Sequence, residues 1–100
     1  MKIGNYDFDL VTTDLNDILN VSGVYVIICN ENGKRFVIDV GESGSLNDRL
    51  NSHDREDCWK KNCKGELSVA IKYLKGHTES QRRDIESDLR TAFNPPCGKR

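Results

Sequence analysis

The sequence predicts a small α/β protein of the α+β type, in which a three-stranded sheet is covered by helices. Two runs rich in β-branched and aromatic residues, 24–29 and 36–40, are joined by an Asn-Gly segment, the strongest short signal for a β-hairpin. Side chains then alternate over residues 67–74, as in a third strand. Helix-start residues precede segments before, between and after these strands, and the helices would supply the apolar cover that a sheet needs.

A length of 100 residues predicts a single domain over residues 1–100. The longest strictly apolar run, residues 24–29, is far shorter than the roughly 20 residues that a membrane-spanning helix needs, which argues against a membrane protein. The first residues lack the charged-then-apolar layout of a signal peptide, so we expect a soluble, cytoplasmic protein. Fifteen basic and 16 acidic residues give a net charge of -1, which argues against a surface that binds nucleic acid everywhere but leaves a local basic face open.

A secreted chain of this size could pair its four cysteines into two disulfides. Without a signal peptide to direct the chain to an oxidising compartment, reduced thiols are expected instead. A structural zinc site is the alternative. The ligand types would come from His53, Cys58, Cys63 and Cys97. Their spacings, Cys-x4-Cys and His-x4-Cys, differ from the tight Cys-x2-Cys pairs of many zinc sites.

The first 22 residues are expected to form a lead-in and a short helix. Residues 1–11 are acidic and partly apolar, and residues 12–14 (Thr-Thr-Asp) are typical of a helix start. Leu15, Ile18 and Leu19 follow at helical spacing. The core of the domain is then expected over residues 23–96.

The hairpin leaves two registers open. If residues 32–33 form the whole loop, Tyr25 lies opposite Val40. If residues 31–33 form a three-residue loop, Tyr25 lies opposite Asp39. A slip of one residue exchanges the faces of the sheet, so the choice decides which side chains meet.

A second helix is expected to begin at Ser45, with Leu46, Leu50 and His53 on one face. Arg49 and His53 are four residues apart and would be neighbours on this helix.

In the charged segment 54–66, Trp59 is predicted to anchor the segment onto the core. The alternative is that Trp59 stacks on a base, with Lys60, Lys61 and Lys64 near phosphate as nucleic-acid-binding residues.

The last helix begins at Thr78, where Gln81 completes a capping box. Its buried stripe is predicted to consist of Ile85, Leu89, Ala92 and Phe93. Glu86 lies at the edge of that stripe, and Asn94 with the two prolines after it ends the helix.

Several of these residues follow one another in a recognisable order. They are Gly23-Val24-Tyr25 on the first strand, Asp39-Val40-Gly41 at the end of the second, Arg49 and His53, Glu86 on the last helix and Asn94 just beyond it. The ordered set resembles the GIY-YIG nuclease domain over residues 23–96. The resemblance implies a central three-stranded antiparallel sheet flanked by helices. It also implies hydrolysis of phosphodiester bonds with one divalent ion, Mg²⁺ or Mn²⁺. DNA is the expected substrate and RNA the alternative.

The resemblance also implies a role for each residue. Tyr25 would activate or position the attacking water, Arg49 would neutralise the scissile phosphate, His53 would shuttle a proton, Glu86 would bind the metal and Asn94 would close the site. The chemistry suits these residue types, because arginine presents a planar donor fork to phosphate and Mg²⁺ is often held by one carboxylate and several waters.

Asp39 departs from the family, which has a tyrosine at this position. Asp39 could act as the base, bind the metal beside Glu86, or cripple the site by repelling phosphate. Glu42, which follows the second tripeptide, adds another acid to the same region. The five matching positions favour an altered mechanism over a decayed site.

The sequence thus predicts a metal-dependent endonuclease. Two alternatives stay open: a catalytically impaired module that binds nucleic acid or protein, and a small zinc-stabilised interaction domain. A catalytic domain of this size is also expected to need a targeting partner or a homodimer for specificity.

Overall fold

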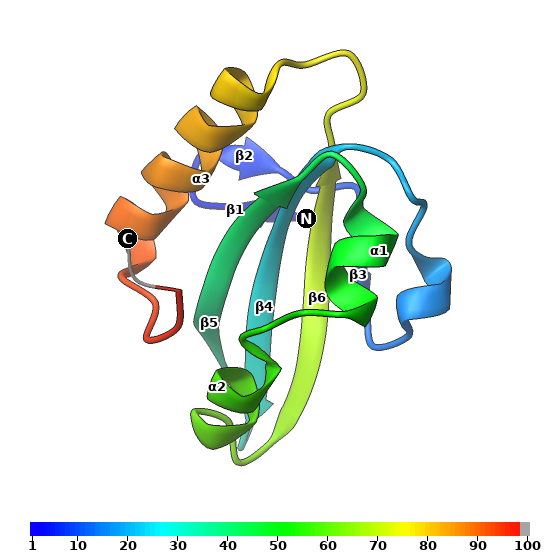
Figure 1. The fold of residues 1–100 in the computed structure, drawn as a ribbon. Coiled ribbons are helices and arrows are strands. Elements are labelled where there is room, and N and C mark those ends of the chain that lie inside the picture. The colour runs from blue at the N-terminus through cyan, green and yellow to red at the C-terminus, as the bar shows by residue number, and fades with distance from the viewer. Residues whose placement is uncertain (99–100) are drawn as a thin grey trace.

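A computed structural model of the protein describes residues 1–98. Its centre is a four-stranded antiparallel sheet with the strand order β3-β6-β4-β5 (Figure 1). The strands are β3 (Leu10–Thr12), β4 (Gly23–Glu31), β5 (Lys34–Ser43) and β6 (Glu66–Tyr73). The predicted α+β class is confirmed, whereas the prediction of three strands is wrong by one strand.

The additional strand comes from the predicted lead-in. The chain begins with a short hairpin of β1 (Lys2–Ile3) and β2 (Tyr6–Asp7), and β3 then pairs with the outer edge of β6. β3 is too short for alternation to predict it. The helix expected after it is only one 3-10 turn, η1 (Leu15–Asp17), and the side chain of Leu19 stays 60 % exposed.

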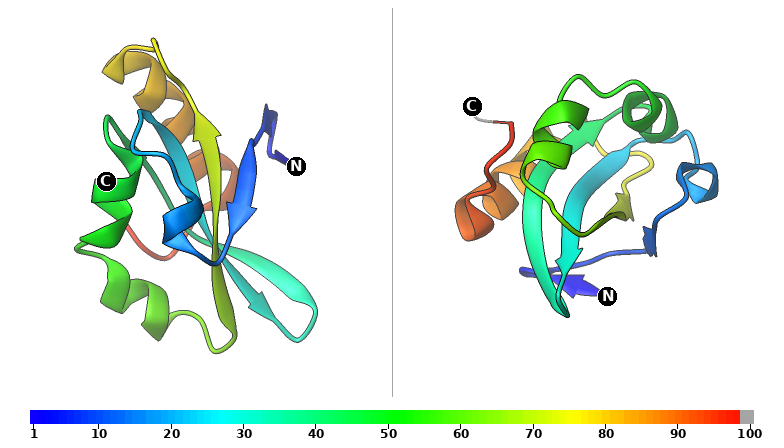
Figure 2. Two further views of the ribbon diagram at one scale, coloured as in Figure 1. Left: turned by 90° about the vertical axis from the view of Figure 1, so that its right-hand side faces the viewer. Right: turned by 90° about the horizontal axis from the view of Figure 1, so that it is seen from below.

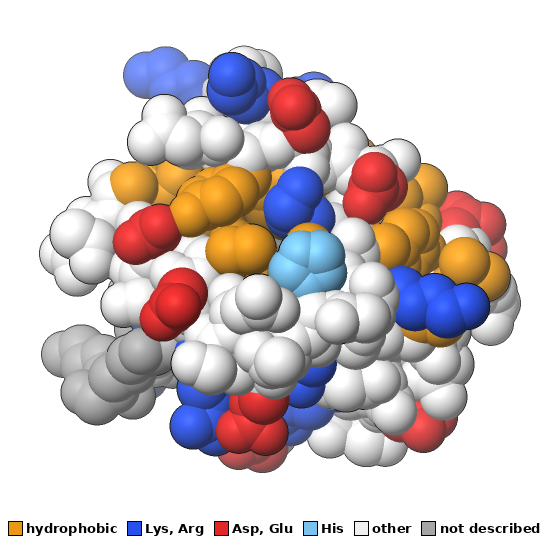
Figure 3. Space-filling view, turned by 90° about the horizontal axis from the view of Figure 1, so that it is seen from above, with side chains coloured by type: hydrophobic (Ala, Val, Ile, Leu, Met, Phe, Trp, Pro, Cys, Tyr) orange, Lys and Arg blue, Asp and Glu red, His pale blue; other side chains and the backbone are white. Residues whose placement is uncertain are grey.

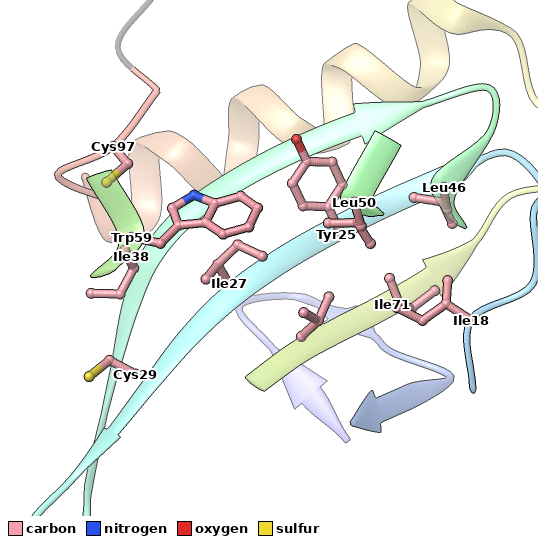
Figure 4. Close-up of a cluster of buried hydrophobic side chains, with 11 residues drawn as sticks. Ile18, Tyr25, Ile27, Cys29, Ile38, Leu46, Leu50, Trp59, Ile71 and Cys97 are labelled. Atoms are coloured by element: carbon pink, nitrogen blue, oxygen red, sulfur yellow. The ribbon is translucent and has the colours of Figure 1, made fainter. Parts of the chain in front are cut away.

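Helices and the N-terminal hairpin cover the two faces of the sheet (Figure 2). On one face lie α1 (Leu46–Asn51) and α2 (Glu56–Lys61), and on the other lie the β1–β2 hairpin and α3 (Glu79–Phe93). The core beneath α1 and α2 includes Tyr25, Ile27, Leu50 and Trp59 (Figure 4). The core on the opposite face includes Val24, Val26 and Leu89. Alternate residues of β4 therefore enter different cores, as the period of a strand requires.

A β-bulge sets the register between β4 and β5. Near the turn, pairs such as Ile28 with Val37 match a two-residue loop at Asn32-Gly33, and both loop residues have positive φ. Past Ile28 the register shifts by one residue, so that Tyr25 faces Gly41. Both predicted partners of Tyr25 are therefore wrong, because a bulge inside the strand cannot be inferred from the loop.

The capping box of Thr78 and Gln81 at the start of α3 is confirmed. The predicted stripe is only partly right. Leu89 is buried and Ile85 is half-buried, whereas Ala92 and Phe93 are exposed. The buried and half-buried residues of the helix lie between Arg82 and Arg90, whereas its first turn and its C-terminal end are exposed.

All four cysteines form disulfide bonds, one between Cys29 and Cys63 and one between Cys58 and Cys97. The prediction of reduced thiols is wrong for this structure. The zinc hypothesis loses its ligands for the same reason, because sulfur atoms bonded to each other do not bind a metal as thiolates. Within residues 1–98, no helix is long and apolar enough to cross a membrane.

Candidate functional site

A cavity of about 400 Å³ opens where β4, β5, α1 and α3 meet. Its walls carry a mixture of hydroxyl, guanidinium and carboxylate groups. The lining residues are Tyr25, Gly41, Glu42, Arg49, Arg55, Arg83 and Glu86. Three positions predicted from the sequence, Tyr25, Arg49 and Glu86, are thus brought together from distant parts of the chain.

Tyr25 reaches the cavity across Gly41. The Tyr25 ring is 1 % exposed and lies against the backbone of the facing residue. A Cβ atom placed on Gly41 would lie 2.2 Å from both Cζ and the hydroxyl oxygen of Tyr25. Only glycine at position 41 leaves room for this ring position.

His53 contacts the same hydroxyl group from below. Its side chain is buried, and Nε2 lies 2.5 Å from the hydroxyl oxygen of Tyr25. The other ring nitrogen, Nδ1, accepts the backbone N–H of Arg55 at 3.1 Å. A neutral imidazole that accepts at Nδ1 carries its proton on Nε2, so His53 donates to the oxygen of Tyr25. The prediction that His53 lies on one helix with Arg49 is wrong, because α1 ends at Asn51.

Burial keeps both partners uncharged near neutral pH. Burial, together with the nearby guanidinium groups of Arg49 and Arg55, lowers the pKa of His53 to about 4. Burial raises the pKa of Tyr25 to about 12, although the same two guanidinium groups oppose this shift. The phenol and the neutral imidazole are therefore the resting forms.

Ion pairs hold the charged walls of the cavity. Nη2 of Arg49 lies 2.9 Å from Oδ1 of Asp54, whose side chain is 73 % exposed. Nε of Arg90 lies 3.3 Å from Oε2 of Glu86, and Nε of Arg82 lies 3.3 Å from Oε2 of Glu42.

Counting only lining residues, three guanidinium groups face two carboxylates, so the cavity carries a net positive charge. On the face that Figure 3 shows, acidic and basic side chains are interspersed.

Asp39 lies beneath the cavity rather than in its wall. It is 0 % exposed, and its carboxylate accepts hydrogen bonds from Nε of Arg55 (2.7 Å), Nη2 of Arg90 (2.8 Å), Nε1 of Trp59 (2.7 Å) and the backbone N–H of Val40 (2.8 Å). Donors from the protein surround both carboxylate oxygens. This arrangement argues against Asp39 as a base or as a metal ligand.

The structure does not bring the remaining predicted site residues to the cavity. Asn94 has a left-handed backbone (φ 45°) and ends α3. Lys60 pairs with Glu56 on the exposed side of α2, and Lys61 and Lys64 are exposed nearby. Trp59 is 6 % exposed and bonded to Asp39, which confirms the anchor and not the base-stacking alternative.

Arg55 and Arg83 are cavity residues that the sequence analysis missed. Arg83 lies one turn before Glu86 on α3, so the helical period alone could have placed it near that residue. Nothing in the sequence pointed to Arg55, because its position depends on the buried carboxylate of Asp39.

A metal ion would have to use the carboxylates of the wall. Among residues 1–98, no group of three or more His, Cys, Asp or Glu side chains is arranged to hold a metal ion. Glu42 and Glu86 both line the cavity, however. One or two carboxylates, completed by water and substrate phosphate, are the usual protein ligands of Mg²⁺, so this wall fits such an ion.

No protein-family model matches the chain, and neither a curated protein nor a solved structure matches it. The resemblance to GIY-YIG nucleases therefore rests on the motif residues of the sequence alone.

Proposed function

We propose that this chain is a divalent-metal-dependent endonuclease of the GIY-YIG type that hydrolyses phosphodiester bonds of DNA. One observation carries the proposal: Tyr25, Arg49 and Glu86, from β4, α1 and α3, line the same cavity. A hydroxyl group, a guanidinium group and a carboxylate are what the reaction needs to position water, neutralise phosphate and hold a metal. The resemblance gives these same positions these same roles.

Arg49 would bind the scissile phosphate. Its side chain is 33 % exposed, and its partner Asp54 is 73 % exposed. An exposed ion pair contributes little to stability, so a phosphate can take the place of Asp54 at low cost. The planar guanidinium group then donates two parallel hydrogen bonds to the phosphate oxygens.

Tyr25 would position the attacking water. Because Nε2–H of His53 donates to the phenol oxygen, the O–H of Tyr25 is available to donate into the cavity. When Tyr25 loses its proton, the same N–H and the charges of Arg49 and Arg55 stabilise the phenolate. The phenolate can then accept a proton from the attacking water. At the same time the oxygen of that water bonds to phosphorus and an ester P–O bond breaks.

Glu86 would hold the Mg²⁺ or Mn²⁺ ion, with Glu42 beside it on the wall. When bound, one such ion would polarise the phosphate and stabilise the leaving oxygen. Asn94 and the three lysines near α2 lie away from the cavity and have no role in this proposal. A second copy of the chain or a targeting partner would supply sequence specificity.

A plasmid-nicking assay with Mg²⁺ or Mn²⁺ tests the proposal. Wild-type protein is expected to nick supercoiled DNA, and Glu86→Gln is expected to lower the rate by at least about a hundredfold through loss of the metal ligand. Asp84→Asn, an exposed acid on the same helix, is the matched control and should keep the activity.

The second candidate is a binding module without catalysis. It is favoured by the ion pair of Glu86 with Arg90, which occupies a carboxylate oxygen that a metal would use. Wild-type protein that binds DNA but does not cleave it with either metal ion would establish this alternative and contradict the nuclease.

A further inference from the structure

Asp39 and Arg55 form a fixed pair at the floor of the cavity. Nε of Arg55 lies 2.7 Å from Oδ2 of Asp39, and Nη2 of Arg55 lies 3.4 Å from Oδ1. The side chain of Asp39 is fully buried, whereas that of Arg55 is 26 % exposed. One edge of the guanidinium group thus points into the protein and the rest of the group faces the cavity.

The outward part of Arg55 retains donor capacity. Nε and Nη2 are used by Asp39, and within residues 1–98 no hydrogen-bond partner is found for Nη1. Arg55 shares the cavity wall with Tyr25 and Arg49. A guanidinium group with free N–H groups beside a second guanidinium group suits an anion with several oxygens, such as a phosphate diester.

We propose that Arg55 is a second phosphate-binding residue of this site, and that Asp39 is the positioning residue that holds its guanidinium group at the cavity wall. This inference rests on the proposed function, because it assigns Arg55 to the substrate of the same cavity. It also accounts for the aspartate at the position where the GIY-YIG motif has a tyrosine. Asp39 does not take over the chemistry of that tyrosine but holds the guanidinium group of Arg55 at the cavity.

The backbone of residue 55 links this pair to Tyr25. The N–H of Arg55 donates to Nδ1 of His53, and Nε2 of His53 contacts the hydroxyl group of Tyr25. Asp39 also binds Nε1 of Trp59, whose ring packs 4.4 Å from the ring of His53. The buried carboxylate of Asp39 therefore holds the side chain of Arg55 directly and the imidazole of His53 through Trp59.

The experiment measures binding of a fluorescein-labelled duplex oligonucleotide by fluorescence anisotropy, with EDTA present so that no cleavage occurs. Salt is varied from about 50 to 200 mM, and the slope of log K against log salt reports the number of phosphate contacts. Arg55→Gln is expected to bind about tenfold more weakly and to lower the magnitude of the slope by about 0.9, as the loss of one phosphate contact requires. Arg35→Gln, an exposed arginine on the hairpin away from the cavity, should change neither value.

Asp39→Asn tests the positioning role. This variant keeps the charge of Arg55 but weakens the bonds that orient it. The salt slope is therefore expected to stay near that of wild-type protein. In the nicking assay with metal, kcat should fall at least about tenfold while KM changes little, because a misplaced donor stabilises the transition state less well than the bound ground state. A merely structural role would lower the melting temperature without this split. A kcat equal to that of wild-type protein would refute the positioning role.

The outcomes separate this inference from the proposed function. If wild-type protein binds DNA with the expected salt slope but never cleaves it, the proposed nuclease activity is refuted. The salt slope of Arg55→Gln still decides whether Arg55 contacts phosphate. Cleavage by wild-type protein with an unchanged slope in Arg55→Gln overturns the inference and leaves the nuclease standing. Absence of DNA binding by wild-type protein refutes both. If Arg55→Gln does not fold, Asp39→Asn/Arg55→Gln removes both charges together and takes its place in the same titration.

Discussion

Nε2 of His53 lies 2.5 Å from the hydroxyl oxygen of Tyr25, and the opposite ring nitrogen accepts the backbone N–H of Arg55. The imidazole is thereby held neutral and in one tautomer. Protonation of Nδ1 would turn an acceptor into a donor that faces another donor. The state of this ring is thus coupled to folding and to the orientation of Tyr25.

Stability is expected to fall as the pH drops from 6.5 toward 4. Burial lowers the pKa of His53 from 6.5 to about 4 in the folded protein, so between these values the unfolded chain binds more protons. The contribution of His53 to the free energy of unfolding is fully present above pH 6.5. On acidification it decreases by about 3 kcal/mol in total. Urea unfolding between pH 4 and 8 measures it. His53→Gln should flatten this part of the pH dependence, and His77→Gln, in an exposed turn, should leave it as it is.

The cleavage rate is expected to rise with pH across the range 7 to 9. The pKa of Tyr25 is raised to about 12, so the phenolate fraction increases about tenfold for each pH unit in this range. Initial nicking rates in Mg²⁺ measure the slope. Tyr25→Phe should lose both the rate and the pH dependence. A slope that persists in Tyr25→Phe would mean that another group activates the water.

Gly41→Ala is expected to displace the ring of Tyr25. The new Cβ atom would lie 2.2 Å from the ring, and such overpacking costs about 1–3 kcal/mol of stability. Thermal unfolding and the nicking rate should both report the change. Gly44→Ala is the matched control, because a Cβ there meets only Arg82 at 3.9 Å. Equal melting temperatures for the two variants would contradict the close contact.

Asp39→Ala is expected to destabilise the protein by about 3–5 kcal/mol, because it leaves Arg55, Arg90 and Trp59 without their shared buried acceptor. Asp54→Ala breaks only an exposed pair with Arg49 and should change stability little. Urea midpoints of both variants measure the difference. Asp39→Tyr is expected to destabilise the protein for the same reason, since two guanidinium groups would lose their carboxylate.

Reduction of the disulfides is expected to destabilise the chain. Cys29–Cys63 and Cys58–Cys97 join residues that are 34 and 39 positions apart. By restricting the unfolded chain, each disulfide that closes a loop of this size is expected to stabilise the folded protein by about 4 kcal/mol. Mass spectrometry of alkylated protein shows whether the bonds form, and unfolding with and without dithiothreitol measures their effect. Four alkylated thiols in protein taken directly from cells would contradict the pairing.

Local sequence signals predicted much of the fold. The Asn-Gly turn, the three long strands and the box of Thr78 with Gln81 depend on neighbours in the chain, and all are present. β3 and the bulge at the register shift between Ile27 and Ile28 escaped prediction for a common reason. A three-residue edge strand and a one-residue register shift depend on the partner strand, which local patterns do not report.

The candidate site was also predicted only in part from the sequence. The sequence by itself determined the residue types and the order of Tyr25, Arg49 and Glu86, which resemble the GIY-YIG motif, because order and residue type are properties of the chain. Only the tertiary structure decided that Asp39 is a buried acceptor, that Arg55 joins the cavity and that Asn94 does not. The physical reason is burial: a carboxylate removed from water must find donors in three dimensions, and the donors it finds here are 16, 20 and 51 residues away.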